Sequence, residues 1–397
     1  MAKLTIEDLD VKGKNVVMRV DFNVPVADGV ITDDNRITAA LKSINYVTER
    51  GGKVILLSHF GRPKSPDDKE FSLKLVADYL AGKVAAKVHF AGDCIGEEAT
   101  RVINEAGFGE IVLLENVRFH KGETKNDIEF SKALAAHGDV FVNDAFGSSH
   151  RAHSSVAGIT GFLQPAAAGY LLEKEIRYLS DSVNAPKRPF VAVLGGAKVS
   201  DKIPVIENLI SKVDTIIVGG GMTYTFYKAK GLPIGNSKLE EDRVELAGEL
   251  MRKAEAKGVK LLLPVDSVVS QEFSNDTPIK TVEEDGIEDG WMALDIGPKS
   301  VSLFSDVIRQ AGTVIWNGPM GVFEMSNFSN GTFAVARSLA EATAKGTISI
   351  IGGGDSAAAI KKAGLDDKVT HVSTGGGASL EYLEGKELPG ITALTDK

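Results

Sequence analysis

Residues 190–202, FVAVLGGAKVSDK, place a short apolar run, two glycines and a polar segment in immediate succession. The run 190–194 is apolar and rich in Val, which is typical of a strand buried on both faces of a parallel sheet. Gly195 and Gly196 let the backbone approach a ligand closely. The spacing predicts a helix after them, capped by Ser200 and with Pro204 in its first turn. A strand that passes through glycine into a helix N-terminus favours the binding of anions.

The same alternation of strand and helix extends in both directions along the chain. Helical periodicity ending at glycine predicts helices over 72–82, 127–138, 223–231, 242–258 and 356–364. The sequence therefore predicts an α/β fold with two doubly wound, mainly parallel-sheet, Rossmann-like domains. Short apolar runs predict strands over 15–20, 53–57, 87–90, 110–114, 139–142, 190–194, 215–218, 260–265, 291–296, 313–316, 347–351 and 369–372.

One long helical segment, from Ala168 to Asn184, is followed by Pro186 and Pro189. A helix that leads into a proline-bracketed linker is a candidate connector between two sheets. We therefore expect an N-terminal domain over 1–167, a connecting helix and hinge over 168–188, and a C-terminal domain over 189–383. The tail 384–397 is expected to pack back toward the N-terminal domain.

Composition excludes several classes of protein. The 397 residues carry a net charge of −9, which argues against general nucleic-acid binding. The single cysteine excludes a disulfide framework and a Cys-rich zinc site, and it suits a reducing, cytoplasmic compartment. We expect no membrane span, because no apolar stretch approaches about 18 residues. The start of the chain has no apolar segment typical of a secretion signal.

Polar clusters follow the strands of the first half. Asp21 and Asn23 alternate with Phe22 and share one face. If Asp21 is buried, it needs a partner. His150 and His153 make only a weak case for a metal, and a polar loop lining a pocket fits them better. Arginine forks at one sheet edge favour a pocket for a small, multiply anionic ligand, with surface salt bridges as the alternative. The cations and histidines concerned are Arg36, His59, Arg62, Arg118, Arg151 and His153.

Glycine follows the strands of the second half, in clusters at 195–196, 219–221, 352–354 and 375–377. Lys198 and Lys202 lie where they could reach a phosphate chain at a helix N-terminus. Ser356 is a candidate helix cap, whereas Asp355 could either cap the helix or hold Mg²⁺ on nucleotide phosphates. The sequence contains no G-x-x-x-x-G-K-[ST] motif and no G-x-G-x-x-G motif after an early strand.

Several longer motifs resemble those of a known family. They are RVDFNVP from Arg19, DNRI from Asp34, SHFGRP from Ser58, VNDAFG from Val142 with HRAHSS from His150, LGGAKVSDK from Leu194, WNGPMGVFE from Trp316, GGGDSAAA from Gly352 and STGGGASLEYLEG from Ser373. Over nearly its whole length the chain resembles phosphoglycerate kinase. Two departures are visible: Phe60 stands where the family commonly has leucine, and Ala293 where many members have glycine.

The resemblance implies a glycolytic enzyme that transfers a phosphoryl group reversibly between 1,3-bisphosphoglycerate with ADP and 3-phosphoglycerate with ATP. It also implies Mg²⁺ as cofactor, a monomer and two domains that close about a hinge. The matching substrate-binding positions of the N-terminal domain are Asp21, Asn23, Arg36, His59, Arg62, Arg118 and Arg151. The nucleotide-binding positions are expected at Gly196, Ala197, Lys198, Lys202, Gly220, Gly221, Asn317, Pro319, Glu324, Gly353, Gly354, Asp355 and Ser356.

The chemistry expected of these residues needs no general base, because a carboxylate acceptor is already ionised at pH 7. Positioning and charge stabilisation then suffice. We expect Arg36 and Lys198 to flank the transferred group, with backbone N–H groups around Gly353 and Gly376 completing an anion cradle. Lys202 would hold nucleotide phosphate, and Asp355 the Mg²⁺. The alternatives are a nicotinamide-dependent dehydrogenase, disfavoured by the missing glycine motif, and a non-catalytic nucleotide-binding protein.

Overall fold

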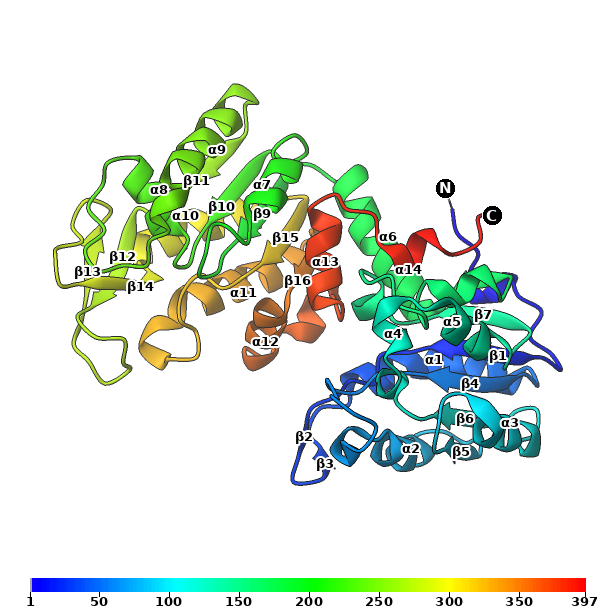
Figure 1. Ribbon diagram of the computed structural model, residues 1–397. Coiled ribbons are helices and arrows are strands. Elements are labelled where there is room, and N and C mark those ends of the chain that lie inside the picture. The colour runs from blue at the N-terminus through cyan, green and yellow to red at the C-terminus, as the bar shows by residue number, and fades with distance from the viewer. Residues whose placement is uncertain (1) are drawn as a thin grey trace. The chain divides into compact units, whose positions relative to one another are not determined.

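The computed structural model describes residues 2–397 and comprises two units (Figure 1). Unit 1 consists of Met1–Arg177 and Glu387–Lys397, and unit 2 of Tyr178–Lys386. Helix α6, Tyr170–Asn184, runs from one unit into the other. The single long helix predicted for this segment is therefore confirmed.

Unit 1 is built on a six-stranded sheet in the order β5-β6-β4-β1-β7-β8, in which all neighbours are parallel. From β1 the chain first builds one side of the sheet and then crosses to the other side for β7 and β8. Such a reversal of direction is where open α/β sheets bind ligands. The strands are β1 Asn15–Arg19, β4 Lys53–Leu57, β5 Val88–Ala91, β6 Ile111–Leu114, β7 Val140–Asn143 and β8 Ala166–Ala168, with a hairpin of β2 Val26–Ala27 and β3 Val30–Ile31.

The helices of unit 1 cover a sheet that is apolar on both faces. All five residues of β4 are buried, as expected for a strand covered on each side. One core combines Val16, Met18 and Leu56 of the sheet with Ile44 of the first helix. The helices are α1 Asn35–Glu49, α2 Lys74–Ala81, α3 Gly96–Glu105, α4 Gly122–Lys125, α5 Ile128–Ala135 and α14 Pro389–Thr392. The last of these belongs to unit 1, where Asn143 donates a hydrogen bond from Nδ2 to the carbonyl of Gly390 (2.8 Å).

Unit 2 contains a second parallel sheet, in the order β11-β10-β9-β15-β16-β17. The predicted α/β class with two parallel sheets is therefore confirmed. Its strands are β9 Phe190–Leu194, β10 Thr215–Val218, β11 Lys260–Leu262, β15 Thr313–Asn317, β16 Ile348–Gly352 and β17 His371–Val372. Its helices are α7 Ile203–Leu209, α8 Thr223–Ala229, α9 Val244–Ala256, α10 Pro298–Arg309, α11 Asn330–Thr343, α12 Gly354–Lys362 and α13 Gly376–Leu383.

A third, antiparallel sheet was not expected from the sequence. The predicted parallel strand at 291–296 is β14 Met292–Ile296, which pairs with β12 Asp266–Ser270 in an antiparallel sheet completed by β13 Ile279–Glu283. Its assignment to a parallel sheet was wrong. The residues of β13 alternate between exposed and half-buried, so this strand offers no apolar run to detect.

Candidate functional site

Four neighbouring parallel strands of unit 1 have their carboxyl ends along one edge of the sheet. The predicted polar clusters follow these strands there. In spatial order they are β6, β4, β1 and β7. The loop after β1 holds Asp21 and Asn23, the loop after β4 holds His59 and Arg62, and Arg118 follows β6. Because parallel strands share their direction, their carboxyl ends bring these side chains together.

Asp21 and Asn23 orient Arg36, one of the cations predicted for this site. Arg36 donates from Nη1 to Asp21 Oδ1 (2.9 Å) and to the carbonyl of Asn23 (3.1 Å). The Oδ1 atom of Asn23 accepts a hydrogen bond from the backbone N–H of Gly61 (2.8 Å). Asp21 therefore has the partner that the sequence required, and Asn23 ties the β1 loop to the β4 loop.

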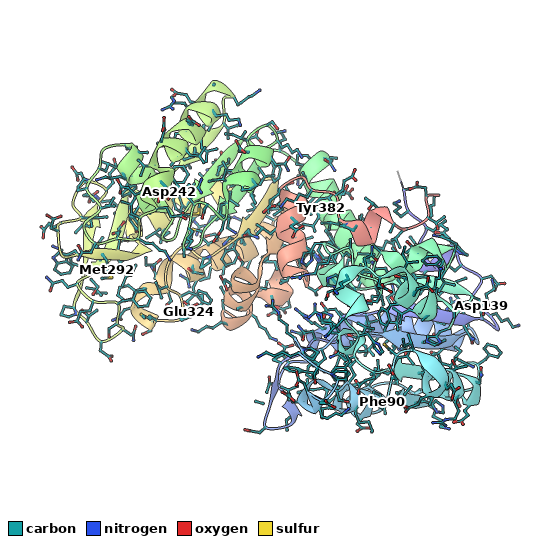
Figure 2. The ribbon with its side chains drawn as sticks, in the orientation of Figure 1. Phe90, Asp139, Asp242, Met292, Glu324 and Tyr382 are labelled. Carbon is teal, nitrogen blue, oxygen red and sulfur yellow. The ribbon has the colours of Figure 1, made fainter. Side chains whose placement is uncertain are left out.

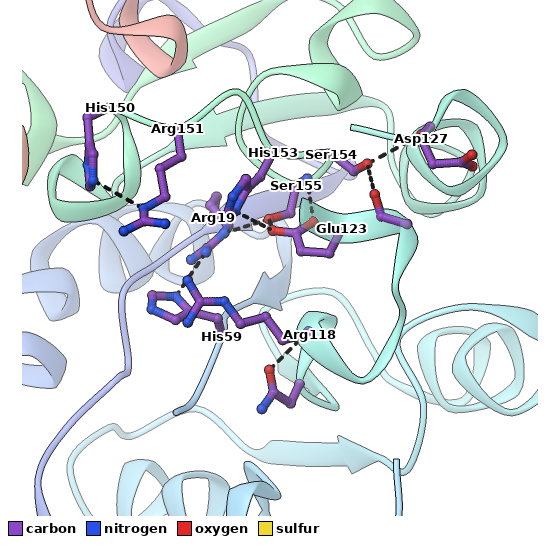
Figure 3. A network of polar contacts seen from close by, with 12 residues as sticks. Arg19, His59, Arg118, Glu123, Asp127, His150, Arg151, His153, Ser154 and Ser155 are labelled. Carbon is purple, nitrogen blue, oxygen red and sulfur yellow. Dashed lines mark hydrogen bonds and ion pairs between the residues drawn. The ribbon is translucent and has the colours of Figure 1, made fainter. Parts of the chain in front are cut away.

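A buried charged network underlies this edge (Figure 3). Arg19 is only 1% exposed, and it donates from Nε to Ser155 Oγ (2.8 Å). Ser155 in turn donates from its hydroxyl to Glu123 Oε1 (2.6 Å). Of the two other guanidinium nitrogens of Arg19, Nη1 donates to the carbonyl of Val20 and Nη2 lies 3.1 Å from Nδ1 of His59. Sequence reasoning missed Arg19 and Glu123 as site residues, although a charged residue at the end of an apolar strand was a visible signal.

Burial and the surrounding cations keep His59 and His153 neutral. Burial, and then the charges of Arg19 and Arg118, hold the pKa of His59 well below its usual value. Burial and the same two arginines lower the pKa of His153 to about 4. At neutral pH these imidazoles therefore offer hydrogen bonds rather than positive charge.

A cavity of about 600 Å³ opens at this edge. Six Arg and Lys side chains line it, whereas no Asp or Glu among residues 2–397 does. Arg118 Nε is buried there and has no hydrogen-bond partner among residues 2–397, and burial together with Arg19 and Arg151 lowers the pKa of Arg118 to about 10. His153 also lines the cavity, as expected for a polar loop. Of the predicted residues, Arg62, Arg118 and Arg151 line this cavity, whereas Asp21, Asn23, Arg36 and His59 are not among its lining residues.

Unit 2 has a cavity of about 640 Å³ at the carboxyl ends of its own parallel strands. Seven glycines line it, so backbone forms much of its wall. The predicted residues that line it are Gly196, Ala197, Lys198, Lys202, Asn317, Gly353, Gly354, Asp355, Ser356 and Gly376.

Two polar side chains of the unit 2 cavity, Lys202 and Asn317, carry buried donors that an anionic ligand could meet. Lys202 is 8% exposed and donates from Nζ to Asn317 Oδ1, and burial lowers its pKa. The amide nitrogen Nδ2 of Asn317 is buried with no partner in the part of the chain that the structure describes. A Cβ on Gly353 would lie 3.0 Å from that nitrogen. Glycine at this position, whose φ is +89°, therefore keeps an unpaired donor clear beside the cavity.

Four predicted nucleotide residues lie outside the lining of this cavity. Gly220, with φ +71°, packs against the loop at Gly196, where a Cβ would come within 2.6 Å of a backbone oxygen. Gly221 lies against Ala197 in the same way. The carbonyl of Pro319 accepts a hydrogen bond from the N–H of Gly196 (3.1 Å). Gly220, Gly221 and Pro319 therefore all support the loop at Gly196 from outside the cavity. Glu324 is exposed (Figure 2).

Two expected helix caps were wrong. Helix α7 begins at Ile203 and not directly after Ser200, whose hydroxyl donates to Glu240 Oε1 (2.6 Å) instead. Ser356 lies within α12, whose cap is Gly353, and its hydroxyl accepts from the N–H of Gly318 (2.6 Å). In both cases a partner distant in sequence holds the side chain that local preference assigns to a cap.

Comparisons with known proteins identify the family of this chain. The family model described as phosphoglycerate kinase matches residues 6–386. The chain belongs to the phosphoglycerate kinase family. It is 58% identical to phosphoglycerate kinase of Clostridium novyi over its full length and 99% of that protein. It is 56% identical to that of Chloroherpeton thalassium, with both chains fully covered.

Solved structures give the same result. The structure of phosphoglycerate kinase from Coxiella burnetii matches with a TM-score of 0.90 at 42% identity, covering 98% of each chain. That from Pyrococcus horikoshii matches with a TM-score of 0.83 at 33% identity, again covering 98% of each. The chain is therefore a glycolytic kinase that transfers a phosphoryl group between 1,3-bisphosphoglycerate with ADP and 3-phosphoglycerate with ATP. Nothing in these matches supports a dehydrogenase. None of the helices among residues 2–397 is long and apolar enough to span a membrane.

Proposed function

We propose that unit 1 binds the phosphoglycerate and that unit 2 binds the nucleotide. The observation that carries this assignment is the cation-rich cavity of unit 1, which six Arg and Lys side chains line without a carboxylate among the described residues. Guanidinium forks match the carboxylate and phosphate groups of a small acid. The glycine-lined cavity of unit 2 instead suits a chain of phosphates, which backbone N–H groups can follow.

In this proposal, catalysis consists of placing two anions together and stabilising the charge between them. Arg36, held by Asp21 at 2.9 Å, would contact the transferred group from unit 1, and the exposed Lys198 would contact it from unit 2. The backbone at Gly353 and Gly376 would add N–H donors. The acceptor carboxylate is ionised at neutral pH, so no residue has to remove a proton. His59 and His153, neutral for the reasons given above, fit a binding role.

The unit 2 cavity also fits a nucleotide-bound Mg²⁺. The exposed carboxylate of Asp355 lines it, and oxygen is the ligand that Mg²⁺ prefers. When bound, the ion would neutralise part of the phosphate charge. Lys202 and the unpartnered Asn317 Nδ2 would meet the remaining phosphate oxygens.

Transfer requires both ligands at one place, and the proposed ligand sites belong to different units. We therefore propose that the units close on each other during each turnover, which also excludes water from the reacting phosphate. The division expected from the sequence, 1–167, 168–188, 189–383 and 384–397, stays a proposal for the parts that move. We further propose a cytoplasmic protein, since the single cysteine is free, and a monomer, as the resemblance to the family implies.

A coupled assay with purified enzyme, 3-phosphoglycerate and MgATP tests the activity, and absence of turnover would overturn it. Arg36→Ala tests the division of labour: we expect kcat to fall by about 10²–10³ while the Kd for ADP, measured by calorimetry, is unchanged. Arg101→Ala is the matched control, because Arg101 is exposed and pairs with Glu105 on its own helix. An equal loss of ADP affinity in Arg36→Ala would contradict the assignment of the nucleotide to unit 2.

A further inference from the structure

A carboxylate, an imidazole and the only cysteine of the chain lie together in unit 1. Asp93 and Cys94 lie in the loop between β5 and α3, and His120 follows the short turn after β6. Because β5 and β6 are parallel neighbours, both loops leave the same edge of the sheet. One possible ligand atom from each of the three residues lies within 4.8 Å of the other two. We propose that this Asp93–Cys94–His120 site binds a divalent cation of the zinc class.

The distances within the cluster are close to those that a metal requires. His120 Nε2 lies 2.7 Å from Asp93 Oδ1, which also accepts the backbone N–H of Cys94 (2.6 Å). The imidazole is stacked on Phe130, with ring centroids 5.1 Å apart, so its orientation is fixed. Ligands about 2.0–2.3 Å from a tetrahedral Zn²⁺ are roughly 3.3–3.7 Å apart, so shifts of about 1 Å suffice.

The site is open to solvent on one side and closed on the other. The side chains of His120 and Asp93 are 30% and 44% exposed, whereas Cys94 is buried beneath them. In the proposed site, an ion would reach the exposed Asp93 and His120 from water, and the buried thiol would be its inner ligand. The fourth position would remain with a water molecule, as in zinc sites that have three protein ligands.

Metal binding would change the protonation and the hydrogen bonds of the three residues. On binding, the sulfur loses its proton to the solvent and forms the bond to the metal, while the hydrogen bond between His120 and Asp93 is broken.

A thiolate and an imidazole select for zinc-like ions over magnesium, so this site differs from the one proposed at Asp355. The same unit offers a natural control. His89 Nε2 lies 2.7 Å from Glu110 Oε2, which reproduces the histidine–carboxylate distance without a cysteine. A pair of that kind lacks the third ligand, so we expect no comparable affinity there.

Titration of the untagged, full-length enzyme with Co²⁺, a spectroscopic substitute for Zn²⁺, tests the proposal. We expect one equivalent to bind, with a thiolate-to-cobalt charge-transfer band in the near ultraviolet that Zn²⁺ abolishes by displacement. Since Cys94 is the only cysteine, such a band identifies the ligand without any variant. Cys94→Ser should remove the band and weaken Zn²⁺ binding by at least about tenfold, because a ligand loss exceeds the usual effect of losing an outer-shell partner.

The control His89→Gln should leave both the band and the affinity unchanged. If Cys94→Ser does not fold, His120→Asn provides the second variant, and it should weaken binding to a similar extent. Absence of the charge-transfer band from the wild-type protein at saturating Co²⁺ would overturn the proposal, as would wild-type Zn²⁺ affinity in folded Cys94→Ser. Neither readout involves turnover, so the outcome is independent of the function proposed above.

Discussion

The two parallel sheets carry different chemistry at equivalent edges. In unit 1 the strands end in long cationic side chains, and Arg118 keeps a buried donor without a partner. In unit 2 they end in glycine, and the wall of the cavity is largely backbone. A compact acid with a carboxylate and a phosphate suits guanidinium forks, whereas an extended polyphosphate suits rows of N–H groups. The difference teaches that one sheet topology can bind anions either through side-chain donors or through backbone N–H groups. Each way lowers the stability of the protein for a different physical reason.

In unit 1 the cost is electrostatic. Burial, and then the neighbouring cations Arg19 and Arg151, lower the pKa of Arg118, and the buried carboxylate of Glu123 offsets part of their charge. In unit 2 the cost is conformational. Gly196, Gly220 and Gly353 all have positive φ, which other L-residues rarely adopt. Substitutions can therefore separate the two kinds of cost.

Loss of the proposed transition-state lysine of unit 2 should have the largest effect. Lys198→Ala should lower kcat by about 10²–10³, or about 3–4 kcal/mol, because the charge it stabilises develops only during transfer. The Kd for MgATP should change little, since Lys202 and the backbone remain. Steady-state kinetics with calorimetry measures both quantities. Lys253→Ala, on an exposed pair with Glu207, is the control. A preserved kcat with a raised KM would assign Lys198 to ground-state binding alone.

An arginine of unit 1 should affect the other ligand. Arg118 lines the cation-rich cavity and also donates from Nη1 to the carbonyl of Gly61 (2.7 Å). Arg118→Gln keeps a polar side chain but removes the charge, so affinity for 3-phosphoglycerate should fall by about 10–100-fold, the value of one or two charge-assisted bonds. Calorimetry with 3-phosphoglycerate and with ADP checks this. A fall in ADP affinity of the same size would remove the distinction between the units.

Much of this arrangement could be predicted from the sequence, because apolar runs mark buried parallel strands and glycine or arginine follows them. The antiparallel sheet could not, since β13 alternates between exposed and half-buried residues. The buried network at Arg19 was missed because charged residues usually lie at surfaces, and only the fold supplies Ser155 and His59 as partners. Asp93 and His120 are 27 residues apart, and only the pairing of β5 and β6 joins them.

Acid should weaken unit 1 through its neutral histidines. The pKa of His153 is about 4 in the folded chain, against about 6.5 when unfolded, so the unfolded state takes up the proton first. Stability from this residue is therefore complete above about pH 6.5 and is lost as pH falls toward 4. Between pH 7 and 5 we expect this residue to contribute a loss on the order of 2 kcal/mol, which His153→Asn should remove while the contribution of His59 remains.

The two units can be followed separately in this experiment. Cys94 is buried in unit 1, so its rate of labelling by a thiol reagent in urea reports the opening of that unit. Both tryptophans, Trp291 and Trp316, lie in unit 2 and report on it by fluorescence. His89→Gln is the control. If His153→Asn keeps the full acid sensitivity of Cys94 labelling, the neutral histidine is not its source.

The smallest effect separates backbone strain from ligand binding in unit 2. Gly353 and Gly364 stand at the two ends of α12, with φ of +89° and +66°. Alanine should destabilise the protein at both positions, by about 1–2 kcal/mol at Gly364 and by up to about 3 kcal/mol at Gly353, whose ψ of 146° places it in a region almost exclusive to glycine. A Cβ on Gly353 would also lie 3.0 Å from Asn317 Nδ2 beside the cavity, whereas one on Gly364 would meet no atom within 4 Å. Gly353→Ala should therefore weaken nucleotide binding several-fold in calorimetry, and Gly364→Ala should not. Equal nucleotide affinities in the two variants would mean that Gly353 serves the backbone turn alone. They would contradict the proposal that the backbone at Gly353 forms part of the phosphate-binding site.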